Sequence, residues 1–209
     1  MSDGETLGLL RQFFDKCPGT RLHLHFESIC GPWERLLDGE ADLIIHHIDK
    51  ADPRFEFIDL RSVALIPVVA PGFLPFPISQ SLKPEQLRDC VQCIIRDSAR
   101  HSPPRDYYVI EGALSWIVSD QLMKKEVILQ RMGWGHLPDF LMSEELKLGR
   151  LLSIKGKYLR GGKVELVAAR QPNVPHGPVA ERLWRFIAGQ APPARTRHRA
   201  QRGTFSLKQ

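Results

Sequence analysis

Polar and charged side chains, and one isoleucine, follow four short runs that are apolar or that alternate apolar with polar residues. They are Ser28 and Ile29 after residues 20–27, His46 after residues 42–45, Arg96, Asp97 and Ser98 after the run that ends at Ile95, and Ser119 and Asp120 after residues 114–118, with Lys124 one helical turn further on. If the runs are strands of an open α/β sheet, these residues lie beyond the carboxyl ends of the strands, where such sheets bind ligands. The sequence therefore predicts a small-molecule site made of these nine residues.

Several of these groups have the chemistry to bind an acidic ligand. Arg96 can hold a carboxylate through two parallel hydrogen bonds, although an ion pair with Asp97 or Asp120 is the alternative. The amides of a helix that begins at Ser119 can receive an anion, whereas the charge of Asp120 opposes an anion and is more typical of a helix cap. Lys124 either reaches the ligand or faces solvent or a second subunit.

The histidines are open to two interpretations. His46 can pair with an acid as a neutral or a charged imidazole. Adjacent histidines such as His46 and His47 at a strand end are also typical of a solvent-facing loop. The position after the strand is therefore the main argument for placing His46 in the site.

Acid–base catalysis is not indicated. Glu34, Glu40 and Asp42 are close in sequence, but Glu34 is expected on the surface of a helix and Glu40 in a turn. The sequence has no Ser-His-Asp order, no GxSxG or HExxH motif and no glycine loop for phosphate. We therefore expect no enzymatic activity and no cofactor.

A metal site is not indicated either. Cys90 and Cys93 have the spacing of half a zinc site, but a structural zinc site needs four ligands. Cys17 and Cys30 are too far apart in sequence to form a second such pair. We expect four buried, reduced thiols and no bound metal.

The elements that would position these residues alternate between helix and strand. Apolar residues at helical spacing predict helices, and alternation or short apolar runs predict strands. The predicted helices are 5–16, 32–38, 84–89, 119–130, 138–147 and 178–187; the predicted strands are 20–27, 42–45, 60–70, 91–96, 107–110, 114–118, 134–137 and 163–169. The run at 42–45 is typical of a buried parallel strand. This order predicts an α/β fold with parallel, doubly wound sheets, arranged as one long sheet or as two lobes.

The positive charge is concentrated at one end of the chain. The sequence has 29 Lys and Arg against 24 Asp and Glu, and residues 190–209 hold five of the basic residues and no acid. The rest of the chain is therefore neutral, and residues 190–209 are predicted to be a disordered basic tail. Because no apolar run reaches the length of a membrane span and residues 1–5 do not resemble a signal peptide, we expect a cytoplasmic protein with no membrane partner.

Several segments, taken in their order and spacing, resemble the effector-binding domain of LysR-type transcriptional regulators. They are Leu9–Pro18, Thr20–Leu24, Trp33–Ile45, Met132–Pro138 and Glu145–Leu151. The resemblance extends over residues 5–189. It implies a fold like that of type II periplasmic binding proteins, in which two Rossmann-like lobes are joined by crossover strands and the effector binds in the cleft between them.

The resemblance also implies how the chain is divided. Lobe I would comprise residues 1–68 and 164–189, and lobe II residues 69–163. The turn at Ser28 would offer a hydroxyl to the effector, or would cap the next helix. Family members form antiparallel dimers in which the first helix of lobe I packs against a lobe II helix of the partner.

The sequence departs from the family ahead of this first helix. Family members usually carry a winged helix-turn-helix and a short apolar strand there, and residues 1–5 supply neither. Loss of an internal strand exposes backbone donors and acceptors on its neighbours, so we expect a weakened lobe I. We also expect no direct sequence-specific DNA binding.

The sequence therefore predicts a regulatory module that senses a small-molecule effector. It would act on transcription through cleft closure and dimerisation, as a homo-oligomer or by pairing with a full-length relative. A solute-binding protein of the same fold is one alternative, but it would need an export signal. A truncated remnant without function is the other, because of the missing strand.

Overall fold

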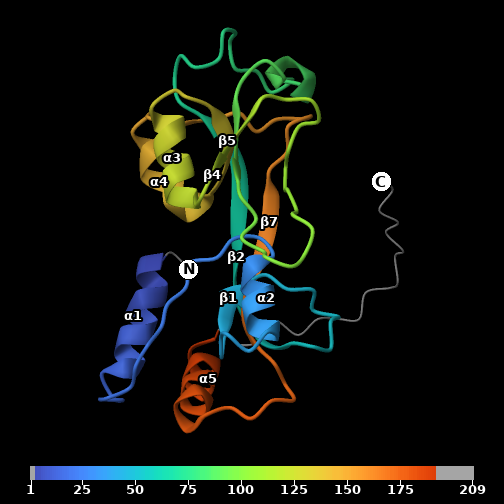
Figure 1. The fold of residues 1–209 in the computed structure, drawn as a ribbon. Coiled ribbons are helices and arrows are strands. Elements are labelled where there is room, and N and C mark those ends of the chain that lie inside the picture. Colours follow the sequence, from blue (N-terminus) through green and yellow to red (C-terminus); the bar gives the residue numbers. More distant parts are fainter. Residues whose placement is uncertain (1–2, 192–209) are drawn as a thin grey trace, which may run out of the picture.

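The computed structural model of the protein describes residues 3–191, which form two α/β lobes around two long shared strands (Figure 1). Lobe I contains α1 (Asp3–Phe14), α2 (Gly31–Leu37), β1 (Ile44–His46) and α5 (Pro178–Gln190). Lobe II contains η1 (Pro84–Leu87), β3 (Gln92–Ile95), β4 (Ser115–Val118), α3 (Gln121–Leu129), β5 (Trp134–Pro138), α4 (Asp139–Lys147) and β6 (Leu152–Ser153). The shared strands are β2 (Glu56–Val69) and β7 (Gly162–Arg170). The predicted two-lobed α/β fold is confirmed, and the predicted tail from residue 192 onward lies outside the described residues.

Strands β2 and β7 form an antiparallel ribbon from which the sheet of each lobe extends. Glu56 pairs with Arg170 at one end and Leu65 with Gly162 at the other, and the register shifts between Asp59 and Arg61. In lobe I, β1 pairs with β7; in lobe II, β5 and β6 pair with β2. The strand order is β1-β7-β2-β5-β3-β4, and β6 pairs with β2 off this path, so the strands of both lobes belong to one hydrogen-bonded sheet that passes through the ribbon.

The prediction of parallel pairing is correct only inside lobe II, where β3 is parallel to β4 and β5. The run at 42–45, predicted as a parallel strand, forms β1 and pairs antiparallel with β7. The reason is that β7 returns from lobe II and lies between β1 and β2. A buried strand reads as a continuous apolar run whichever way its neighbour points, so the sequence could not distinguish the two cases.

Each lobe has apolar clusters on both sides of its strands. In lobe I, Leu36 and Phe55 pack on one face of β7, and Trp184 and Ile187 of α5 pack near Ala168 on the other. In lobe II, two clusters surround β2 and β5: one holds Val69, Leu82, Leu87, Cys90, Trp134, Ile154 and Leu159, and the other holds Val68, Cys93, Ile128, Leu137, Met142 and Leu151. The four cysteines are buried and free, as predicted.

Two predicted strands are wrong. Residues 20–27 are extended but form no strand, and Leu24 and Phe26 are 52% and 77% exposed. The edge of the described sheet in lobe I is β1, so this segment has no paired neighbour there. Residues 107–110 lie in the long loop between β3 and β4. Their backbone hydrogen bonds are made to the side chain of Gln92 and not to a neighbouring strand. Gln92 donates to the Tyr108 carbonyl (2.6 Å) and accepts from the Ile110 amide (3.0 Å).

Candidate functional site

The turn at Ser28 of lobe I meets the loop after β3 of lobe II, and this contact forms the centre of what we call the interlobe seam. The seam comprises residues 27–34 of lobe I together with residues 97–102 and Ser119 of lobe II. The Ser28 amide donates to Ser98 Oγ (2.8 Å), and Ser98 Oγ donates back to the Ser28 carbonyl (3.1 Å). Two predicted site residues that are 70 positions apart therefore bind each other directly across the lobes.

Asp97 provides a second link across the seam. One of its oxygens accepts from the amides of Cys30 and Ala99, each at 3.0 Å, and the other accepts from the Arg105 amide at 3.0 Å. Burial disfavours the charge of Asp97, but the Ala99, Arg105 and Cys30 amides outweigh it and hold the pKa of this carboxyl below its usual value. Asp97 is thus an ionised group that joins the start of α2 to lobe II.

Glu34 makes the third link, and the prediction that it lies on the helix surface is wrong. It is 9% exposed, and its carboxylate accepts from the amides of Arg100 (2.5 Å), His101 (3.1 Å) and Ser102 (2.7 Å). The Arg100 amide and the Ser102 hydroxyl are the main reasons why its pKa falls to about 2. No pattern within α2 signals this role, because its partners lie on the other lobe.

A network of ion pairs runs along the same side of the seam. Arg35 contacts Glu27 and lies 2.8 Å from Glu40, and Arg100 of lobe II lies 3.0 Å from Glu40 and 3.4 Å from Asp38. Most of these groups are partly exposed, and exposed pairs of this kind each contribute about 0–1 kcal/mol. The network therefore fixes the orientation of the two lobes at the seam more than it adds to the stability of the fold.

Aromatic rings border the seam on the lobe I side. His46 ends β1, and its Nε2 lies 2.8 Å from the Ile29 carbonyl. Burial, with a smaller contribution from His47, lowers the pKa of His46 to about 3, so His46 is a neutral imidazole that donates to Ile29. The rings of Trp33 and His47 are 4.9 Å apart, and Tyr107 of lobe II stands 6.1 Å from His47. A planar or apolar group could pack here beside the amides of the seam.

The predicted residues at the start of α3 are only partly at the seam. Ser119 offers its carbonyl to Ser28 Oγ at 3.4 Å, and its own hydroxyl donates to Asp120. Asp120 caps the helix by accepting from the Met123 amide at 2.8 Å, as its charge suggested. These groups are used within lobe II and by Ser28.

The two predicted cationic site residues lie apart from the seam contacts. The side chain of Arg96 is exposed and forms no ion pair with Asp97 or Asp120 among the described residues. Lys124 is neither solvated nor at a subunit surface, because it is 6% exposed and packs over Gly135, where an added Cβ would lie 2.7 Å from its Cε. Burial lowers the pKa of Lys124 to about 8, against a smaller opposing effect of Cys93.

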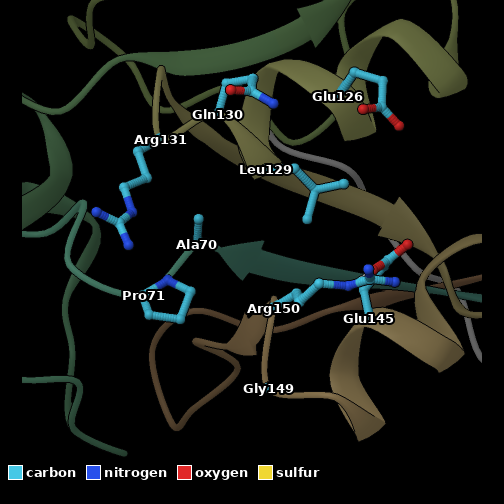
Figure 2. Close-up of a pocket in the computed structure, with 9 residues that line it drawn as sticks. All are labelled: Ala70, Pro71, Glu126, Leu129, Gln130, Arg131, Glu145, Gly149 and Arg150. Atoms are coloured by element: carbon cyan, nitrogen blue, oxygen red, sulfur yellow. Dashed lines mark ion pairs between the residues drawn. The ribbon is translucent and has the colours of Figure 1, made fainter.

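A separate pocket of about 580 Å³ opens on lobe II at the C-terminal end of α3 (Figure 2). The seam lies at the other end of that helix, where Ser119 precedes its N-terminus. It is lined by Ala70, Pro71, Glu126, Leu129, Gln130, Arg131, Glu145, Gly149 and Arg150. Arg150 is paired with Glu145 at 2.5 Å, and none of the predicted site residues lines the pocket. The candidate site is therefore the seam.

Among residues 3–191, no three or more His, Cys, Asp or Glu side chains are grouped so as to hold a metal ion. In the same range, each helix is too short or too polar to cross a membrane.

Residues 4–192 match the family described as the LysR substrate binding domain. No curated protein sequence matches the chain. The family match covers most of the chain and agrees with the predicted resemblance and its extent.

Solved structures of LysR-type regulators have the same fold. Full-length HypT of Salmonella typhimurium, a hypochlorite-specific LysR-type transcriptional regulator, aligns with a TM-score of 0.62 and 22% identity over 89% of this chain and 64% of HypT. The regulatory domain of CrgA from Neisseria meningitidis aligns with a TM-score of 0.63 and 15% identity over 90% of this chain and 92% of that domain. Full-length LysG of Corynebacterium glutamicum, solved with bound effector Arg, aligns with a TM-score of 0.63 and 15% identity over 86% of this chain and 61% of LysG. The chain thus spans less than two thirds of the full-length regulators, and its fold is the two-lobed, type II periplasmic-binding-protein-like fold of their regulatory domains.

Proposed function

Because the chain belongs to the family of LysR substrate binding domains, we propose that it is the effector-sensing part of a LysR-type transcriptional regulator and that the interlobe seam is its effector site. The observation that carries this proposal is the direct contact of Ser28 with Ser98, which joins the turn before α2 in lobe I to the loop after β3 in lobe II. Ser28, Ile29, His46, Asp97, Ser98 and Ser119 form the proposed site. Arg96 at the rim and Lys124 behind it would act only after the lobes rearrange.

The seam suggests how a ligand would act. In this structure the amides and hydroxyls that an effector would use are bonded to one another, so the lobes are held together by the protein itself. A ligand that bridges the two loops must replace these bonds and can shift the lobe angle only by the difference in its affinity for the two arrangements. We propose that lobe I, residues 1–68 and 164–189, moves against lobe II, residues 69–163, by flexing of β2 and β7.

Two exposed apolar surfaces support an antiparallel dimer as the output of this motion. The lobe I apolar surface consists of Leu7 on α1 and of Leu22, Leu24 and Phe26 beside it. The lobe II apolar surface consists of Leu114 and Trp116, just before and on β4, and of Leu122 and Met123 on α3. A two-fold axis can place the lobe I apolar surface of each subunit against the lobe II apolar surface of its partner. The closed dimer would then contain this contact twice and would leave neither surface exposed.

We further propose that the domain acts in the cytoplasm and reaches DNA only through a helix-turn-helix, its own or that of a full-length relative. A catalytic or transport role has no support at the seam, where each charged group is paired within the protein. The alternative is a remnant without function. Binding of a ligand to the domain would exclude it.

Thermal melting with a library of amino acids, dicarboxylates and aromatic acids tests the proposal. A compound that binds the folded state raises the melting temperature by mass action. The same compound should have a much smaller effect on Ser98→Ala, which removes the hydroxyl at the centre of the seam, and an undiminished effect on Ser81→Ala, which alters an exposed loop of lobe II. Binding that is unaffected by Ser98→Ala would place the effector elsewhere.

A further inference from the structure

We propose that the backbone amides of Arg100, His101 and Ser102 form a carboxylate-binding site, that Glu34 is its resident occupant, and that a small free carboxylate binds there when Glu34 is absent or withdrawn. We call the three N–H groups the amide cradle. The cradle and Glu34 lie within the seam, beside the six residues proposed to bind the effector. The inference goes beyond the proposed function because it concerns a different set of donors, and it holds whether or not those six residues bind an effector.

The geometry of the cradle is that of a ligand site. Three consecutive amides converge on one carboxylate, with Arg100 N at 2.5 Å from Oε2 and Ser102 N at 2.7 Å from Oε1. The amide of His101 lies between the two oxygens, at 3.1 Å and 3.3 Å. Successive backbone N–H groups that point into one concavity are a recurrent way to bind anions.

The donors at the cradle are suited to a monocarboxylate. The guanidinium of Arg100 is turned to Asp38 and Glu40, 3.4 Å and 3.0 Å away, so the cation next to the cradle is already neutralised. The contacts to Glu34 come from backbone amides and the Ser102 hydroxyl. A single negative charge on a small planar group therefore matches the cradle, whereas a doubly charged ion would leave charge uncompensated.

The occupant and the cradle belong to different lobes. Glu34 lies in the first turn of α2 in lobe I, and the cradle lies in the loop after β3 in lobe II. Any motion that separates the lobes must withdraw the Glu34 carboxylate and leave three amides without an acceptor. A small carboxylate that occupied the cradle would relieve that cost and would hold the lobes apart.

Chemical rescue of Glu34→Ala tests this inference on the whole chain. We expect Glu34→Ala to melt several degrees below the wild type and to recover part of the loss in tens of millimolar sodium formate, compared with sodium chloride at the same ionic strength. The backbone amide resonances of Arg100, His101 and Ser102 should shift with formate in the variant and stay fixed in the wild type, whose cradle is full. Acetate should act in the same way but more weakly if the space left by Glu34 is tight.

Glu40→Ala is the matched control, because Glu40 contacts the Arg100 side chain but not the cradle. Formate should have no specific effect on Glu40→Ala. The inference is wrong if formate and chloride act alike on folded Glu34→Ala, or if formate stabilises the wild type and Glu40→Ala as much as it stabilises Glu34→Ala.

Glu34→Gln keeps the test decisive if Glu34→Ala does not fold. It preserves the size of the side chain but presents an amide N–H₂ where one acceptor stood, so hydrogen exchange of a peptide spanning residues 99–103 should speed up. Formate should slow that exchange again in Glu34→Gln. Unchanged exchange in the variant would show that the cradle does not depend on the carboxylate.

Discussion

Lobe I and lobe II differ in how completely their strands are paired and covered. In lobe II, β3 lies between β4 and β5, and Trp134, Leu137, Met142 and Leu151 have no exposed surface. In lobe I, β1 is three residues long and lies at the sheet edge, while residues 20–27 form no strand. Alternating apolar residues therefore specify which face of a segment is to be covered, but they do not supply the neighbour that turns the segment into a strand.

The same difference predicts an uneven distribution of stability. Segments with few buried contacts and unpaired backbone open at low free energy, whereas closed cores open only with the whole domain. Lobe II should therefore set the global stability, and lobe I should contain the regions that open first. Four substitutions or conditions test this comparison, from the largest expected effect to the smallest.

Leu137→Ala should have the largest effect. Leu137 is fully buried between β2, α3 and α4, so truncation should lower the free energy of unfolding by about 2–5 kcal/mol. Leu24→Ala is the matched change in lobe I and should cost less than about 0.5 kcal/mol, because Leu24 is half exposed. Urea denaturation of both variants measures the difference, and equal losses would refute the comparison.

Gly31→Ala should come next, because it tests the contact between the lobes. An added Cβ would lie 2.0 Å from Ser98 Oγ and 2.9 Å from Glu27 Oε2, so we expect a loss of about 1–3 kcal/mol. Ser98→Ala in the same chain removes the nearest atom and should recover part of it. Gly8→Ala, in α1 with open space around it, should instead stabilise the protein slightly. A Gly31→Ala protein as stable as Gly8→Ala would mean that the lobes do not close on this seam.

Acidification should destabilise both lobes through buried imidazoles, His136 in lobe II and His46 in lobe I. Burial is the main cause that lowers the pKa of His136 to about 4, and its Nε2 faces the Arg160 carbonyl. Because the unfolded imidazole binds a proton near pH 6.5 and the folded one does not, the contribution is complete above pH 6.5 and is lost as the pH falls towards 4. At pH 5.5 the loss from His136 should be about 1 kcal/mol, and His46, whose pKa burial lowers to about 3, should add a similar loss. Urea unfolding at pH 7 and pH 5.5 should show this loss in the wild type and a smaller one in His136→Gln; equal losses would contradict the assignment.

Phe26→Ser should have the smallest effect on stability. Its side chain is 77% exposed, so the free energy of unfolding of the monomer should change by less than about 0.5 kcal/mol. Its effect should appear in self-association, measured by light scattering, if the lobe I apolar surface lies in a dimer. Trp116→Ser on the lobe II apolar surface should then weaken association to a similar degree. A large loss of monomer stability in Phe26→Ser would show that residues 20–27 pack into the core after all.

Most elements were predictable from the sequence, because helices and buried strands carry their own periodicity. The helix at 178–187 and the strand at 91–96 are examples, and they correspond to α5 and β3 with shifts of a few residues at the ends. The pairing partners were not predictable. The direction of β1 depends on β7, which is more than 100 residues away in the chain, and the loop at 107–110 depends on the side chain of Gln92.

The sequence anticipated which predicted residues meet between the lobes, but not how they are bonded. The rule that ligand sites follow strand ends selected Ser28, His46, Asp97 and Ser98, and the structure brings these residues to one seam. Whether they bind an effector stays a prediction. Glu34 was missed because α2 alone gives no sign that the loop of another lobe offers it three amides.

The paired register of β2 and β7 limits the motions that can connect the lobes. A slip of one residue along the ribbon would turn every side chain of the moving strand to the opposite face, so sliding is excluded. Torsion and bending are what remain, and the irregularity between Asp59 and Arg61 is where a ribbon of this kind twists most easily. If an effector moves the lobes as proposed, the movement would therefore be a rotation, with small displacements beside the ribbon and larger ones at the distal helices.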